Sequence, residues 1–139
     1  MFIGHRECYG MDEKQLEREI IALIKKGVDT FLSGGMGRFD AVCERIVSQL
    51  KDEYPAVKIY IIMPYLNFKT KHIMRADEMI FPEGFELYHP KAAIQKRNRY
   101  MADRSSYAIC YVRNSWGGAA QTLNYVKKQP IECIMIADK

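Results

Sequence analysis

The stretch FLSGGMGRFDAVCERIV, residues 31 to 47, joins a short apolar run to a helical pattern through three glycines. The run ends at Ser33, and Gly34, Gly35 and Gly37 follow before apolar residues recur at helical spacing. The first N–H groups of a helix have no partner inside it, and the helix dipole makes that end partly positive. Because glycines let the backbone approach a phosphate closely, this junction is suited to an anion.

A second junction of the same kind follows a later apolar run. The segment YAICYV, residues 107 to 112, precedes a helical pattern that begins at Gly117 and Gly118. In a parallel sheet both junctions lie at the carboxyl ends of strands, the edge where open α/β folds bind ligands. We therefore expect the two loops to line one crevice. The alternative is that the glycines serve tight turns and helix packing.

The rest of the chain alternates between strand and helix patterns. Residues 57 to 65, VKIYIIMPY, are nearly continuous in apolar residues, as in a strand covered on both faces. Residues 11 to 27 form an amphipathic helical pattern, with Asp12 placed to cap it and Gly27 to end it. Between residues 67 and 90 we expect only a helical turn and a short strand. The pattern predicts an α/β fold, a Rossmann-like doubly wound, mostly parallel sheet of about six strands with helices on both faces.

Composition limits the classes of function. The 139 residues carry a net charge of +4, which favours anionic ligands but falls short of a dedicated nucleic-acid binder. The four cysteines form no CxxC pair and the three histidines show no metal-ligand spacing, so we expect reduced thiols and no metal. No apolar run is long enough for a bilayer, and we expect a cytoplasmic protein with no membrane partner.

Arg97 lies on a predicted helix between the two glycine loops. It shares a face with Ile94 and Met101, and that face is expected to turn toward the sheet. A guanidinium there offers paired donors for a phosphate. The alternative is an arginine that extends past the edge of the core or pairs with an acidic neighbour, as Arg99 and Asp103 are spaced to do on another face.

Further polar residues stand near the same predicted edge. His5 and Arg6 directly follow the first apolar segment, and the hydroxyls of Ser33 and Thr122 neighbour the two loops. Asp40, in the first turn of its helix, is interpreted either as a contact to ribose hydroxyls or as a carboxylate that stabilises the helix dipole. Trp116 precedes the second loop and is placed either to stack on a base or to anchor an interface.

Several segments together resemble the SLOG superfamily, and most closely its YpsA-like branch. They occur in the order GHR (4–6), FLSGGMGRFD (31–40), ADEMIFP (76–82), RNRYMADRSSYAICYV (97–112) and GGAAQTLNYVKKQ (117–129). The resemblance implies one SLOG-like domain over residues 1–139 with a Rossmann-like fold. It also implies binding of a nucleotide or a nucleotide-derived, ADP-ribose-like ligand.

Some members of that superfamily, the LOG proteins, are phosphoribohydrolases. Arg97, Asn98 and Met101 match their RKxxM segment except that asparagine replaces lysine. Their catalytic glutamate falls on Asn124, and an amide neither stabilises an oxocarbenium-like state nor accepts a proton from water as a carboxylate does. We therefore expect no hydrolysis by the LOG route, and we assign no catalytic residue.

The sequence thus predicts a binding module, a sensor or a sequestering protein, that needs no cofactor and forms a homodimer. The aromatic residues Tyr60, Tyr65, Phe68 and Phe81 are candidates for an interface or for the core. Two alternatives stay open: a LOG-like nucleoside monophosphate phosphoribohydrolase, and a DprA-like binder of single-stranded nucleic acid. The predicted ligand-binding residues are Gly4, His5, Arg6, Ser33, Gly34, Gly35, Gly37, Asp40, Arg97, Asn98, Gly117, Gly118, Ala119 and Thr122.

Overall fold

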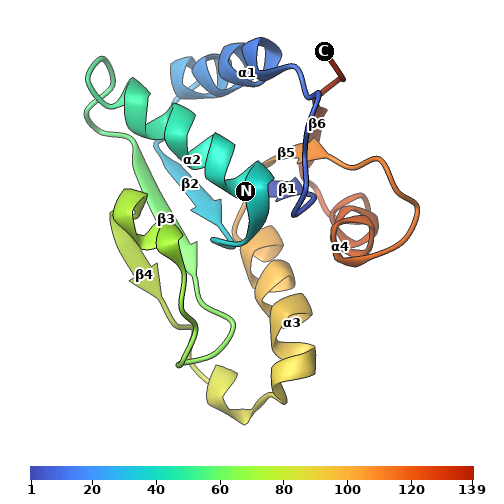
Figure 1. Cartoon of the computed structure of the whole chain (residues 1–139). Helices are drawn as coiled ribbons and strands as arrows, with labels where there is room; N and C mark the ends of the chain where they lie inside the picture. The colour runs from blue at the N-terminus through green and yellow to red at the C-terminus, as the bar shows by residue number, and fades with distance from the viewer.

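The computed structural model describes all 139 residues as an alternation of strands and helices (Figure 1). The predicted alternation is confirmed throughout, including the turn and short strand expected in the weakest region. In chain order the elements are β1 (Phe2–Gly4), α1 (Glu13–Lys25), β2 (Thr30–Ser33), α2 (Gly37–Leu50), β3 (Lys58–Ile62), the 3₁₀ helix η1 (Lys71–Arg75), β4 (Glu78–Ile80), the 3₁₀ helix η2 (Phe85–Leu87), α3 (Pro90–Asp103), β5 (Tyr107–Tyr111), α4 (Gly118–Val126) and β6 (Glu132–Met135).

All strand pairs are parallel, which confirms the α/β class, but the strands form two sheets of three. One sheet has the order β1-β5-β6 and the other the order β2-β3-β4. β1 and β2 lie close to each other without a hydrogen-bonded ladder between them. The expected single sheet is therefore split at this seam. β1 is only three residues long, and the carbonyls that follow it, those of His5 and Arg6, bond to the start of α2.

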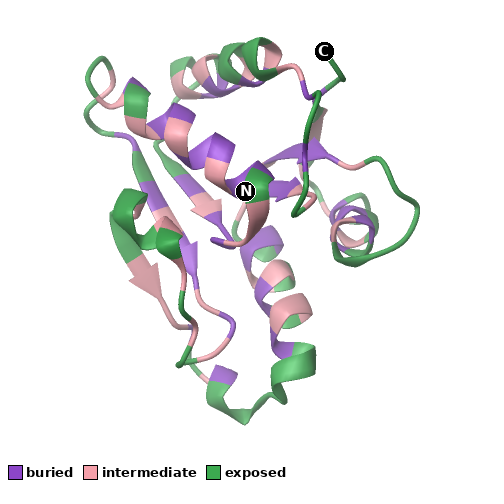
Figure 2. Cartoon of the chain, viewed as in Figure 1, coloured by how far each residue is buried: buried purple, intermediate pink, exposed green.

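Helices cover the strands on both sides, as predicted for a doubly wound fold. Phe2 packs in an apolar cluster with α1 and α2, whereas its neighbour Ile3 packs in a second cluster with α3 and α4. Successive strand residues point to opposite faces, so this split places the two helix pairs on opposite sides. Figure 2 shows the buried side of α2 turned toward the strands. The carboxyl ends of the strands remain uncovered between the two helix layers.

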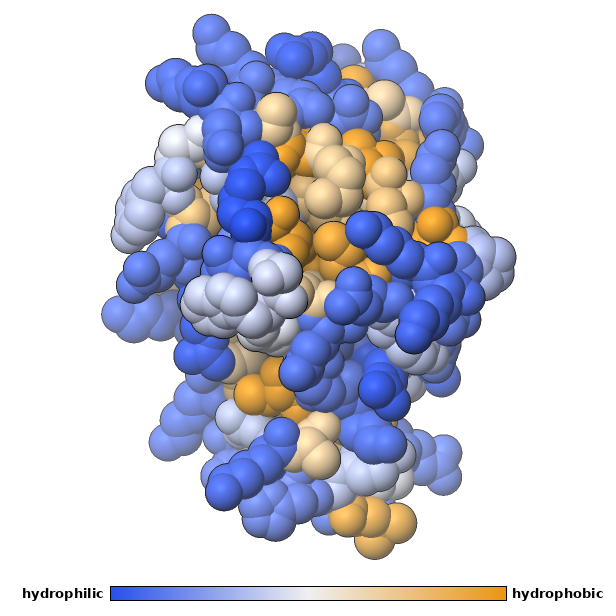
Figure 3. Space-filling view, turned by 90° about the vertical axis from the view of Figure 1, so that its right-hand side faces the viewer, coloured by the Kyte–Doolittle hydropathy of each residue, from blue (hydrophilic) through white to orange (hydrophobic).

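The surface is mostly hydrophilic. On the face shown in Figure 3, an apolar area in the upper half is surrounded by hydrophilic side chains. The aromatic residues Tyr60, Tyr65, Phe68 and Phe81 are half-buried within the chain. None of the helices combines the length and the apolar character that a membrane crossing requires.

The predicted cap of α1 is present, because the Asp12 side chain accepts a hydrogen bond of 3.0 Å from the Gln15 backbone N–H. We expect Asp12→Ala to lower the free energy of unfolding by about 1 kcal/mol, since the N–H loses its acceptor. Chemical denaturation measures this loss. Asp12→Asn retains a side-chain oxygen and serves as the control, and an equal loss in both variants would contradict the capping role.

Candidate functional site

A cavity of about 340 Å³ opens at the carboxyl ends of the strands, where the seam between the two sheets meets α3 and α4. Both glycine loops line it, as predicted. Three of the predicted residues, Ser33, Gly35 and Gly37, do not. The predicted residues that line the cavity are Gly4, His5, Arg6, Gly34, Asp40, Arg97, Asn98, Gly117, Gly118, Ala119 and Thr122.

Arg97 is 3% exposed and forms the buried floor of the cavity. Its Nη1 donates to the carbonyl of Gly34 at 2.9 Å and to the carbonyl of Ile62 at 3.0 Å. Its Nη2 contacts only the Met36 sulfur, at 3.4 Å. Burial lowers the Arg97 pKa to about 10, so the group stays charged at neutral pH. Most donors of this guanidinium are therefore committed to the fold, and Nη2 is the part left for a ligand.

A chain of side-chain hydrogen bonds leads from Arg97 to the second glycine loop. Arg97 Nε donates to Asn98 Oδ1 at 2.9 Å, and Asn98 Nδ2 donates to Thr122 Oγ1 at 3.0 Å. Thr122 in turn donates to the Gly118 carbonyl at 2.9 Å. The asparagine that replaces the lysine of the LOG pattern thus connects the two loops.

The first glycine loop does not offer the row of free amides that was predicted. Within α2, the Arg38 N–H donates to the Arg6 carbonyl at 2.8 Å and the Phe39 N–H to the His5 carbonyl at 3.4 Å. Before the helix, the Gly35 N–H donates to Ser33 Oγ and the Met36 N–H to Asp40 Oδ2. The segment after β1 therefore occupies much of the position in which an anion was expected.

The second glycine loop retains its free amides. The N–H groups of Gly118, Ala119 and Ala120, at the start of α4, have no acceptor within the chain. Gly118 and Ala119 line the cavity, so the partly positive end of α4 lies at its wall. The nearby His5 accepts the Arg113 N–H at Nε2, over 2.8 Å. A neutral His5 ring therefore carries its proton on Nδ1.

Several glycines are required by close packing. A Cβ on Gly34 would lie 3.0 Å from Arg97 Cζ, and a Cβ on Gly4 would lie 2.2 Å from Phe39 Cγ. Gly117 differs, because a Cβ there would meet nothing within 4 Å but its φ of +89° is unfavourable for other residues. These observations fit the alternative interpretation, in which the glycines serve packing and tight turns: packing explains Gly34, and a turn with positive φ explains Gly117.

Asp40 is the one carboxylate among the residues lining the cavity. Its Oδ2 accepts the Met36 N–H at 3.2 Å, and Oδ1 has no partner in the chain. Every side-chain polar atom that is sealed from solvent has a partner, so the unpaired Oδ1 is accessible to solvent, and Asp40 lines the cavity. Burial and the nearby Glu44 raise the Asp40 pKa to about 7. The hydrogen bond from the Met36 N–H and the charge of Arg97 lower it, but they offset only part of this rise.

The sequence did not predict the group of Glu44, His72 and Thr70, which forms hydrogen bonds to the first glycine loop. Glu44 is fully buried, accepts from Ser33 Oγ at 2.6 Å, and pairs with His72 Nδ1 at 2.8 Å. The hydrogen bond to Glu44 raises the His72 pKa. Thr70 adds a bond of 2.7 Å to the Gly35 carbonyl. An acidic residue four positions after Asp40 on a buried helix was the available signal, but the partner His72 lies in a segment without a clear pattern.

Asn124, Asp103 and Trp116 differ in their position relative to the cavity. Asn124, at the position of the LOG glutamate, is exposed and lies outside the cavity. The expected pairing of Asp103 with an arginine is wrong, because its carboxylate accepts from the Tyr125 hydroxyl while Arg99 stacks over the same ring. Trp116 lines the cavity and is 71% exposed. No group of acidic, histidine or cysteine side chains is arranged to hold a metal ion.

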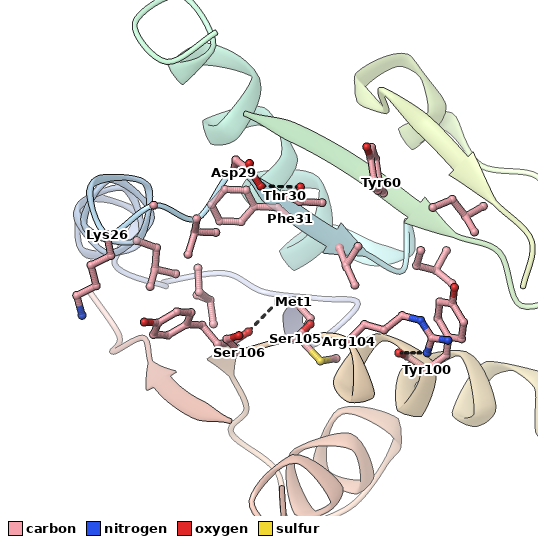
Figure 4. A pocket seen from close by; sticks show the side chains of 18 residues that line it. Met1, Lys26, Asp29, Thr30, Phe31, Tyr60, Tyr100, Arg104, Ser105 and Ser106 are labelled. Carbon is pink, nitrogen blue, oxygen red and sulfur yellow. Dashed lines mark hydrogen bonds between the residues drawn. The ribbon is translucent and has the colours of Figure 1, made fainter. Parts of the chain in front are cut away.

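A larger cavity, of about 530 Å³, lies between the two sheets near the starts of β2 and β5 (Figure 4). Its walls are mainly apolar. Its two cationic groups nearest the seam have partners in the chain: Arg104 donates to the Tyr100 carbonyl at 3.3 Å and lies over the Tyr100 ring, and the amino group of Met1 donates to the Tyr107 carbonyl at 2.9 Å. The smaller cavity, with its free amides and uncommitted polar atoms, is therefore the better candidate site.

Arg97→Lys tests the bridging role of the guanidinium. One ammonium group does not reproduce the fork that holds two carbonyls and Asn98, so at least one buried carbonyl loses its donor. We expect the free energy of unfolding to fall by about 3 kcal/mol, measured by chemical denaturation. Arg99→Lys, on the exposed side of the same helix, is the control and should change it by less than about 0.5 kcal/mol. Equal stability of the two variants would show that the bridge is dispensable.

Asp40→Asn tests the environment of the carboxyl group. Because the pKa rises from its ordinary value of 3.8 to about 7 in the folded protein, the wild type loses stability as the pH increases from about 4 to about 7. The variant lacks this loss, so above pH 7 it should be more stable, by up to roughly 4 kcal/mol. Denaturation curves at a series of pH values measure the difference, and a difference that does not vary with pH would contradict the raised pKa.

Comparison with known proteins places this geometry in a family. The family model described as the YspA SLOG family matches residues 4–132. A UPF0398 protein of Halalkalibacterium halodurans is 23% identical over 128 residues, which cover 84% of this chain and 68% of the relative. The SPbeta prophage-derived protein YoqJ of Bacillus subtilis is 28% identical over 140 residues, with 82% of this chain and 81% of the relative covered. The match spans both glycine loops and the arginine between them, and the chain belongs to the YspA SLOG family.

Proposed function

We propose that this protein binds a nucleotide or a nucleotide-derived ligand of the ADP-ribose type, and that it acts as a sensor or sequestering module. The observation that carries the proposal is the uncapped start of α4, where Gly118 and Ala119 line the cavity and their N–H groups have no acceptor in the chain. An anionic phosphate satisfies such donors and interacts favourably with the helix dipole.

Four further features support a phosphate-bearing, nucleotide-like ligand. Membership in a SLOG family points to a nucleotide-related role. The charged Arg97 lies beneath the cavity with Nη2 only weakly engaged, and the exposed Arg6 side chain stands at its rim without an ionic partner. Trp116 provides an exposed ring beside the free amides, suited to stacking on a base. The cavity volume lies within the range usual for small-molecule sites.

Hydrolysis by the LOG route is not part of this proposal. The residue at the position of the catalytic glutamate, Asn124, is an amide and lies outside the cavity. The homodimer predicted from the sequence remains part of the proposal, and native mass spectrometry of the purified protein reads both the oligomeric state and any retained ligand.

Gly118→Pro tests the amide site with little effect on the helix. Gly118 is the first residue of α4, where proline is well tolerated, and the substitution removes one N–H donor. We expect Kd for phosphate-bearing ligands to rise about tenfold or more, since a hydrogen bond to a charged group contributes about 1.5–3 kcal/mol. Thermal shift against AMP, NAD, ADP-ribose and adenosine, followed by calorimetry, measures this change.

Gly118→Ala is the matched control, because it keeps the N–H group and its Cβ would only approach Gln95 Nε2, at 3.4 Å. This variant should bind as the wild type does. Adenosine, which lacks a phosphate, should produce no shift. The proposal is wrong if none of the phosphate-bearing compounds stabilises the wild type, or if the proline variant binds them undiminished.

A further inference from the structure

Asp40 occupies an unusual place for a carboxylate in an anion site. It lines the same cavity as the free amides of α4, and it is only 9% exposed. One of its oxygens has a single backbone donor, and the other has no partner in the chain and is accessible to solvent. An ionised carboxylate in water is surrounded by donors, so the ionised form of Asp40 is poorly compensated here.

The surrounding charges do not supply that compensation. Glu44, one turn further along α2, is itself engaged by Ser33 and His72. Arg97 is attracted to Asp40 but directs its donors to carbonyls and to Asn98. The ionisable groups around Asp40 are Cys43 and Glu44 on α2, Arg97 on α3, His72 on η1, the amino group of Met1 before β1, and His5 and Arg6 after β1.

A phosphate that enters this cavity brings further negative charge close to Asp40. Two anions in one small, partly desolvated space repel each other, and the repulsion is relieved when the carboxyl group takes up a proton. The neutral acid can carry its proton on Oδ1, the oxygen without a partner in the chain, and it then donates where the carboxylate could only accept.

We propose that Asp40 contacts the ligand as a neutral carboxylic acid, donating a hydrogen bond from Oδ1 to a phosphate oxygen, so that the ligand binds together with one proton. This inference rests on the proposed function, since it requires a phosphate in the cavity. It assigns Asp40 a role different from the ribose contact considered from the sequence, in which an ionised carboxylate accepts from sugar hydroxyls. The two roles predict opposite effects of pH.

The test is calorimetric titration of the full chain with ADP-ribose at about pH 6 and about pH 8.5, each in two buffers of different ionisation enthalpy. ADP-ribose is chosen because its pyrophosphate diester does not titrate in this range. For the wild type we expect Kd to be roughly 30-fold higher at the upper pH, as linkage to a group titrating near 7 requires. The buffer dependence should report uptake of close to one proton per ligand at the upper pH.

Asp40→Asn mimics the neutral acid, with an amide N–H in place of the O–H. Its Kd should be nearly independent of pH, and at about pH 8.5 it should bind more tightly than the wild type. Asp103→Asn, which removes an exposed carboxylate outside the cavity, should behave as the wild type does. The proton uptake is measured on the wild type, so the test does not depend on the stability of any variant.

Each remaining outcome identifies what has failed. Binding by the wild type that does not change with pH overturns the inference and leaves the proposed function standing. An Asp40→Asn variant that binds more weakly than the wild type at both pH values overturns it in favour of the ribose contact. Absence of ADP-ribose binding under every condition counts against the proposed function itself, and the inference falls with it.

Discussion

The arrangement of this protein depends on the hydrogen bonds of one buried guanidinium. Arg97 extends from α3, which packs with α4 and the β1-β5-β6 sheet, and it bonds to the carbonyls of Gly34 and Ile62 at the ends of β2 and β3. It therefore fastens together two sheets that share no ladder. The same side chain holds Asn98, through which it reaches the start of α4. Arg97 thus both joins the two sheets and lines the candidate site.

The two glycine loops look alike in sequence but have different tasks. In the first loop, the carbonyls of His5 and Arg6 accept hydrogen bonds from the N–H groups of Phe39 and Arg38 at the start of α2. In the second loop, no segment of the chain accepts hydrogen bonds from the first N–H groups of α4, so these groups remain free. The asymmetry gives the cavity one wall whose amides are bonded within the chain and one wall whose amides are free. A ligand held by α4 would therefore lie against the packed loop, with Asp40 and Arg97 beside it.

The order of the elements and the position of the site follow from local patterns in the sequence. Apolar periodicity and glycines predicted where strands end and helices begin, and parallel topology brought Gly34 and Gly118 to one cavity. The seam between β1 and β2 could not be predicted, because apolar patterns do not encode which strands form a ladder. The support by Glu44 and His72 was also hidden, since their separation of 28 positions gives no sign of contact. A glycine motif also does not reveal whether another segment of the chain accepts hydrogen bonds from its N–H groups.

Both cavities lie along the seam, one near the starts of β2 and β5 and the other at the opposite, carboxyl end. No backbone hydrogen bond crosses from β1 to β2, so the two sheets are joined there by side-chain packing, by the Arg97 hydrogen bonds, and by the two backbone bonds from the start of α2 to the carbonyls of His5 and Arg6. A ligand bound to the start of α4 and to Arg97 would contact both sheets and hold them together. Such a ligand would restrict motion of the two sheets relative to each other without a change in secondary structure.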